Sequence, residues 1–299
     1  MDSPFVLITP AYNEEKRLQR CIESVAAQTL LPLRWVIVSD GSTDRTDEIV
    51  KEAACRHPFI SYLRLERPAQ DRRSTDRITK GIVAAVMAGV ETVASLDYMY
   101  LAKMDADVTL EPAFFEKVLR RMEGDPRLGL AGGGIYNVGA PGGFLNPEFV
   151  GGPVRVFRRE CWKSIGGLLP FGHEDVTSAA SARMKGWTVR CFPEIKAYQH
   201  DVPRNTAREK IPVCFHLGQL DYIMGGLLSF ELARSGTRML KHPLFLAGGS
   251  MLLGYLWARV RRMPIELPPD LLEFMQAEQR RKLHEKLSWR AVRPGASNV

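Results

Sequence analysis

Over its first 200 residues the chain alternates short apolar runs with longer segments whose apolar residues recur at helical spacing. Residues 14–28 are one such helical segment, with Leu18, Cys21, Ile22 and Val25 as its apolar residues. Expected strands are Phe5–Thr9, Arg34–Ser39, Phe59–Leu65, Tyr100–Met104, Leu128–Gly133, Val154–Arg158 and Trp187–Phe192. Strands that alternate with helices predict an α/β fold with a mostly parallel central sheet and right-handed crossovers.

Polar residues follow two of these strands directly. Asp40 comes after the second and Asp105 after the fourth. Because ligands of such sheets bind beyond the carboxyl ends of the strands, both aspartates are expected to face one crevice. Residues 132–153, which are rich in Gly and Pro, predict an irregular loop that covers this crevice.

The segment Lys103–Asp107 carries the strongest chemical signal. Asp105 and Asp107 lie one residue apart at the end of a buried strand. Carboxylate oxygens at this spacing suit Mg²⁺ or Mn²⁺, which bridge to substrate phosphates. Asp-x-Asp is also common in solvated turns, and its position at a strand end is what favours the metal site.

Three further segments combine turn residues with acidic ones: Pro10–Glu14, Ser39–Asp44 and Gly172–Asp175. The first two could flank a nucleotide, and the third could supply a general base. Each also has a purely structural explanation, because Ser, Thr, Asn and Asp cap helix N-termini without any ligand.

Taken together, these four motifs resemble those of the family 2 glycosyltransferases, which have the GT-A fold, over roughly residues 5–200. The resemblance implies that the first two segments bind the nucleoside of the donor, that the Asp-x-Asp binds metal and diphosphate, and that Asp175, rather than Glu174, is the catalytic base. The implied donor-binding residues are Pro10, Tyr12, Glu14, Asp40 and Asp105, and the implied metal ligands are Asp105 and Asp107.

Other stretches resemble a bacterial subgroup of this family that makes exopolysaccharides and other surface glycans. They are Asp125–Gly133 and Phe157–Gly167. Arg72 could approach the diphosphate or belong to a surface ion pair, and His200 could complete the metal site or be structural. The Gln-x-x-Arg-Trp motif of processive members is missing, since the nearest candidate reads Gln279-Arg280-Arg281-Lys282-Leu283.

The resemblance thus implies an inverting, non-processive enzyme that uses Mn²⁺ or Mg²⁺. It would move one sugar from a nucleotide diphosphate sugar donor to a hydroxyl of a glycan, such as a lipid-linked one in surface polysaccharide synthesis. Two alternatives are a catalytically inactive homologue that acts as a membrane scaffold and a sugar-phosphate nucleotidyltransferase. The second is disfavoured, because this sequence lacks the Gly-rich phosphate loop of such enzymes near its N-terminus. A nucleic-acid partner is disfavoured, because the basic runs lack interleaved aromatic residues.

The positive charge is concentrated in the last third of the chain. Residues 201–299 contain 15 Lys and Arg against 9 Asp and Glu, which accounts for most of the net charge of +7. We expect a catalytic domain over 1–205 and a helical extension over 206–299. The uncharged stretch His242–Ala258 is flanked by basic residues and fits three arrangements: a helical hairpin packed on the protein, an interfacial helix on anionic lipid with Tyr255 and Trp257 at headgroup level, or a membrane span. The interfacial arrangement is favoured, because apolar length and flanking cations coincide.

Targeting signals also bear on location. The N-terminus has neither a basic region nor a cleavage site of a signal peptide, and the five scattered cysteines fit reduced thiols. A cytoplasmic protein bound peripherally to the inner face of the cell membrane is therefore predicted.

Overall fold

A computed structural model describes residues 3–66, 75–139, 143–170, 173–200, 207–239 and 245–291. The chain divides between Val202 and Pro203 into two compact units, each of which is described by itself. Arg72, Gly172 and His242 lie outside the described residues, so their predicted roles remain predictions.

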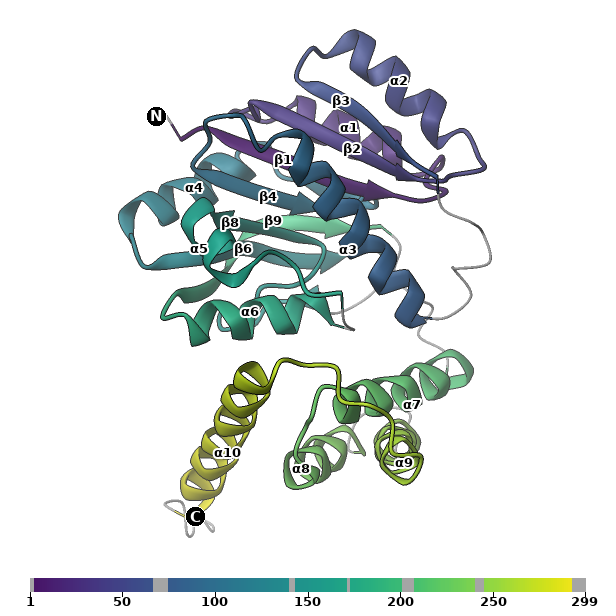
Figure 1. Ribbon diagram of the computed structural model, residues 1–299, viewed down its shortest axis with the longest axis vertical. Coiled ribbons are helices and arrows are strands. Elements are labelled where there is room, and N and C mark those ends of the chain that lie inside the picture. The colour runs from purple at the N-terminus through teal and green to yellow at the C-terminus, as the bar shows by residue number, and fades with distance from the viewer. Residues whose placement is uncertain are drawn as a thin grey trace, which may run out of the picture. The chain divides into compact units, whose positions relative to one another are not determined.

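The N-terminal unit is built on one curved sheet, which has nine strands within the described residues (Figure 1). Its first half is parallel, as predicted, and its second half is mixed, because β8 enters antiparallel to both β4 and β6. In spatial order the strands are β3 (Ile60–Leu65), β2 (Arg34–Asp40), β1 (Phe5–Ala11), β4 (Tyr100–Met104), β8 (Val154–Arg158), β6 (Leu128–Asn137), β9 (Thr188–Gln199) and β5 (Val108–Leu110), with β7 (Gly143–Phe144) paired to β6.

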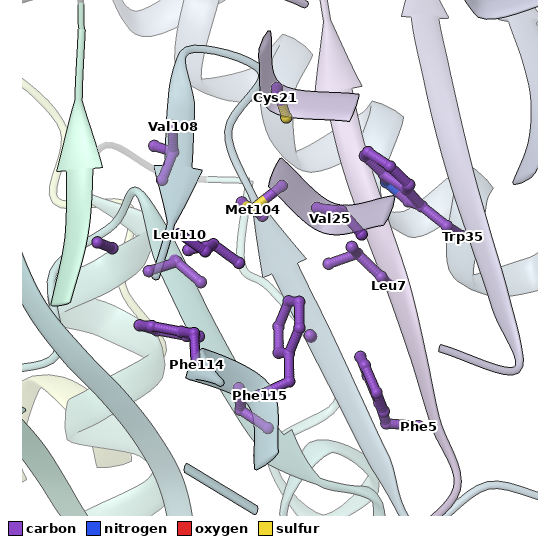
Figure 2. Close-up of a cluster of buried hydrophobic side chains, with 14 of the residues drawn as sticks. Phe5, Leu7, Cys21, Val25, Trp35, Met104, Val108, Leu110, Phe114 and Phe115 are labelled. Atoms are coloured by element: carbon purple, nitrogen blue, oxygen red, sulfur yellow. The ribbon is translucent and has the colours of Figure 1, made fainter. Parts of the chain in front are cut away.

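Helices cover both faces of this sheet. One face packs against α1 (Leu18–Ala26), α2 (Thr46–Arg56) and α4 (Phe114–Gly124), and the other against α3 (Thr75–Thr92), α5 (Arg159–Ile165) and α6 (Glu174–Met184). The strands serve both layers, because successive side chains point to opposite faces. In β1, Phe5 and Leu7 join the first apolar cluster, shown in Figure 2, whereas Val6 and Ile8 join the second.

The glycine-rich segment differs from its prediction as a loop. Strand β6 continues through it to Asn137, and β7 returns along β6. A side chain on Gly133 would collide with the Phe114 ring and the Ile195 backbone, so this glycine permits close packing inside the sheet. Within the described part of the segment, residues 138–139 form a turn and residues 145–153 are irregular.

The C-terminal unit consists of helices, as predicted: α7 (Ala207–Ile223), α8 (Leu228–Met239), α9 (Leu246–Val260) and α10 (Pro269–Ala291). Two glycines of α9 let it pack closely on its neighbours. A side chain on Gly254 would collide with the Phe215 backbone of α7, and one on Gly248 with the Ser235 backbone of α8. Within the described part of the chain, no helix is both long and apolar enough to cross a membrane.

Candidate active site

The carboxyl ends of three neighbouring parallel strands place the predicted residues at one edge of the sheet. Strand β1 lies between β2 and β4, with Ala11 opposite Ser39 and Ile8 opposite Lys103. The segments that follow these strands therefore start side by side. Asp40 and Asp105 lie at this edge on strands separated only by β1, as the alternation of strands and helices predicted.

The first two motifs interlock through backbone and side-chain hydrogen bonds. The Asn13 N–H donates to Ser42 Oγ at 3.2 Å, and the Thr43 N–H donates to Asn13 Oδ1 at 2.8 Å. The Glu14 N–H donates to Thr46 Oγ1 at 2.8 Å. Asn13 has a φ of 55°, a conformation that Asn tolerates better than most residues. These contacts fix the loop after β1 against the start of α2.

Side chains of the predicted donor-binding residues differ in exposure. Asp40 is buried beneath the edge, whereas the Tyr12 ring is exposed. Pro10 lies within β1, one residue before the end of the strand, in a half-buried position. Burial raises the pKa of the neighbouring Cys21 thiol, and Asp107, Asp105 and Glu14 add to that increase. The carboxylates of Asp107, Asp105 and Glu14 are therefore all close enough to Cys21 to raise the pKa of its thiol.

The Asp-x-Asp motif forms the turn between β4 and β5. The Asp105 N–H donates to the Pro153 carbonyl at 2.8 Å, and Asp107 Oδ2 accepts from Gln199 Nε2 at 3.2 Å. Burial, opposed by Lys103 and assisted by the charges of Asp107 and Glu174, raises the pKa of Asp105 to about 6. Carboxylates that repel one another in this way form a place where a cation is stabilised.

The acidic pair occupies the first turn of α6, and its two members have different surroundings. Glu174 Oε1 accepts from Arg155 at 3.1 Å, and although burial opposes it, Arg155 and Lys103 lower the pKa of Glu174. Within the described part of the chain, Asp175 Oδ1 accepts a short-range bond, from the Val176 N–H at 2.9 Å. Burial and the Glu174 charge raise the pKa of Asp175. A carboxylate with a raised pKa is the better proton acceptor, so Asp175 is better suited than Glu174 to take a proton.

Lys103 connects these two acidic groups. Its ammonium donates to Asp105 Oδ1 at 2.5 Å and to the Gly152 carbonyl at 2.9 Å, and it lies 3.8 Å from Glu174 Oε1. The Asp175 and Glu174 side chains in turn face Gly152. Lys103 thus contacts both Asp105 and Glu174, and Asp175 faces the same backbone at Gly152. Lys103 and Arg155 were not predicted as site residues, although each is a charged residue within a buried strand, which was a usable signal.

A divalent metal ion needs several ligand atoms around one point. Within the described residues, no three His, Cys, Asp or Glu side chains are placed to enclose an ion. The ring of His200 contacts Thr109 Oγ1 through Nε2 at 2.9 Å and Arg20 through Nδ1 at 3.5 Å. Asp105 and Asp107 still fit Mg²⁺ or Mn²⁺, because such ions are commonly held by one or two carboxylates plus substrate phosphates and water.

Comparison with known proteins places this arrangement in a family. The model of glycosyl transferase family 2 matches residues 6–177, which include β1 to β4, the Asp-x-Asp motif and the acidic pair. The chain belongs to this family. The match covers more than half of the sequence and confirms the family inferred from the four motifs.

Individual relatives match over shorter stretches. Chondroitin synthase from Escherichia coli is 32% identical over 116 residues, which are 39% of this chain and 15% of that protein. EpsJ from Bacillus subtilis, an uncharacterized glycosyltransferase, is 27% identical over 130 residues, which are 44% of this chain and 33% of that protein. The matched part therefore spans a third or less of these relatives.

Solved structures confirm the GT-A type of fold. The mannosyltransferase PcManGT from Pyrobaculum calidifontis, solved with GDP-Man and Mn²⁺, superposes with a TM-score of 0.56 at 18% identity, over 96% of this chain and 79% of that one. Residues 1–349 of TarS from S. aureus, solved with UDP, superpose with a TM-score of 0.54 at 13% identity, over 99% and 94%.

Proposed function

We propose that this family 2 protein is an inverting, non-processive glycosyltransferase that moves one sugar from a nucleoside diphosphate sugar to an acceptor hydroxyl. The observation that carries the proposal is the contact of Lys103 with both Asp105 and Glu174, with Asp175 next to Glu174 and facing the same backbone at Gly152, beyond the carboxyl ends of the parallel strands. The GDP-Man and UDP of the two structural neighbours support a nucleotide-linked donor.

The chain's own residues account for most of the reaction. Pro10, Tyr12, Glu14 and Asp40 would hold the nucleoside, and Arg72 the diphosphate. The Asp175 carboxylate would take the proton of the acceptor hydroxyl as its oxygen bonds to the anomeric carbon, while the bond from that carbon to the diphosphate oxygen breaks and its electron pair leaves with the diphosphate. Asp105 and Asp107, with His200 beside them, would hold Mn²⁺ or Mg²⁺, which neutralises charge on the leaving group when bound.

A binding screen followed by a transfer assay tests this function. We expect a nucleoside diphosphate with Mn²⁺ to raise the melting temperature by several degrees at saturating concentration, because ligands stabilise the folded state that binds them. The matching nucleotide sugar should then release its sugar faster with a glycan acceptor. Binding without release would indicate an inactive homologue, and formation of a nucleotide sugar from a nucleoside triphosphate would indicate a nucleotidyltransferase.

We further propose that the acceptor is lipid-linked and that the C-terminal unit rests on the inner face of the cell membrane. Support comes from an exposed apolar stripe along α9, in which Leu253 is 62% and Val260 81% exposed. The members of this α9 stripe are Leu246, Leu253, Leu256, Trp257 and Val260. Exposed Arg259, Arg261 and Arg262 adjoin it, which suits anionic headgroups.

The stripe corrects one detail of the sequence-based prediction. Tyr255 was expected beside Trp257 at headgroup level, but its ring is buried and its hydroxyl donates to the Gly226 carbonyl at 2.7 Å. Residues two apart on a helix point in different directions, so the two aromatic side chains do not share a face. Trp257, which is exposed, is therefore the aromatic residue available to a lipid surface.

Vesicle binding tests the membrane proposal. Leu253→Asp with Val260→Asp should weaken binding to phosphatidylserine-containing vesicles at least about tenfold, since each buried Leu or Val contributes roughly 1.5–3 kcal/mol. Cosedimentation at rising salt measures this, and binding should weaken as salt screens the arginines. Leu33→Asp, at an exposed apolar position in the N-terminal unit, is the control. Absence of binding at low salt, or a stripe buried in a dimer, would overturn the proposal.

A further inference from the structure

Lys103 is buried in the middle of the sheet, where a lysine is expensive to keep. Its side chain is 1% exposed, and its strand, β4, lies between β1 and β8. A charged group in such a place persists when it is paired and hydrogen-bonded. Among the described residues, the groups that meet this requirement for Lys103 belong to the active site: Asp105, the Gly152 carbonyl and Glu174.

A second buried cation lies directly opposite. Lys103 pairs in register with Arg155 of β8, whose side chain is also fully buried. Like charges opposite each other on neighbouring strands repel. Glu174 offsets that repulsion, because its Oε1 lies 3.1 Å from Arg155 and 3.8 Å from Lys103. Arg155 also donates to the Glu174 carbonyl at 3.3 Å and to Ser178 Oγ at 2.7 Å. These bonds hold the N-terminal part of α6 against β8.

These contacts make a continuous mechanical link across the active site. One end is Asp105, at the end of β4, and the other is the first turn of α6, which carries Asp175. A third contact point is the backbone at Gly152, which the acidic pair faces. Helix α6 and strand β4 are distant in sequence, so their spacing near the reacting atoms depends on such side-chain links.

We propose that Lys103 is a positioning residue for sugar transfer, which acts through Glu174 and sets the separation between the phosphate-side carboxylate Asp105 and the base Asp175. The proposal rests on the proposed function. It assigns Glu174 to positioning as well, because that carboxylate pairs with both cations, whereas Asp175 forms its hydrogen bond with the Val176 N–H. Displacing the base by about 1 Å is enough to slow a reaction roughly 100-fold.

A double-mutant cycle with Lys103→Met and Glu174→Gln tests the link. Lys103→Met keeps the length of the side chain and removes its charge and donors. We expect it to lower kcat by about 10- to 100-fold with less effect on the donor KM. Because both residues act as one unit, the double variant should lose about as much as the more impaired single variant, far less than the product of the two losses. Lys103→Arg should recover part of the activity.

The ion pair between Lys117 and Glu111, at 2.6 Å, provides a matched control cycle on the surface. Lys117→Met and Glu111→Gln carry the same chemical changes and should leave kcat unchanged. If Lys103→Met does not fold, Lys103→Gln, which retains a donor, takes its place. If the wild type is active, either of two results would overturn the proposal. One is an unaltered kcat in the Lys103 variants, and the other is a double variant whose loss of kcat equals the product of the two single losses. An inactive wild type would instead count against the proposed function.

Discussion

Replacing Asp175 by Asn is expected to lower kcat by about 10²- to 10⁴-fold, the usual contribution of a general base, and to leave the affinity for the donor nearly unchanged. Asn has the shape of Asp and keeps an oxygen for the Val176 N–H, so the start of α6 should keep its structure. What it lacks is the ability to take the proton of the acceptor hydroxyl. The loss should therefore appear in turnover and not in donor binding.

Single-turnover kinetics and a donor titration measure the two quantities separately. Burial and Glu174 raise the pKa of Asp175, so the activity of the wild type should fall with decreasing pH in a range above that of an ordinary aspartate. That acid limb should be absent from the Asn variant. Glu174→Gln is the informative comparison, because it perturbs position but leaves the base. If donor affinity collapsed together with kcat, Asp175 would be a binding residue.

Much of this site follows from the order of strands and helices in the sequence. Asp40 and Asp105 were predicted to share one edge because each follows an apolar strand of a parallel sheet, and the structure places them there on either side of β1. The identity of the family followed from motif spacing, which survives even when element boundaries shift. The helix expected from Glu14, for example, begins at Leu18, since residues 13–17 form the interlocked turn.

The pairing of strands that are far apart in the sequence could not be predicted from local sequence patterns. Nothing near Val154–Arg158 says that this strand inserts antiparallel beside β4, yet that insertion brings Arg155 opposite Lys103 and beneath α6. The same limit applies to glycines, whose meaning depends on what approaches them. Gly133 was expected where a strand passes into a loop, but it lies inside β6 and allows the contact with Phe114 in the core.

Replacing Asp105 by Asn is expected to abolish most of the metal-dependent activity and to do so without lowering stability. Losing a carboxylate that supports the ion should raise the Mn²⁺ concentration for half-maximal activity by at least about 100-fold, beyond the 10- to 100-fold typical of outer-shell changes. The Mn²⁺-dependent rise in melting temperature with a nucleoside diphosphate should disappear as well.

The stability half of this prediction follows from linkage. The folded-state pKa of Asp105 is raised to about 6, so its charged form opposes folding, and stability declines as pH rises from the unfolded pKa near 3.8 through 6. A neutral Asn avoids that decline, and at pH 8 without metal the variant should melt no lower than the wild type. Calorimetry at pH 5 and 8 measures this, with the exposed Asp97→Asn as the control. A variant that melted several degrees lower would show that Asp105 is retained for the fold. A variant that melts no lower but has lost its metal-dependent activity would show that Asp105 is retained for the cation.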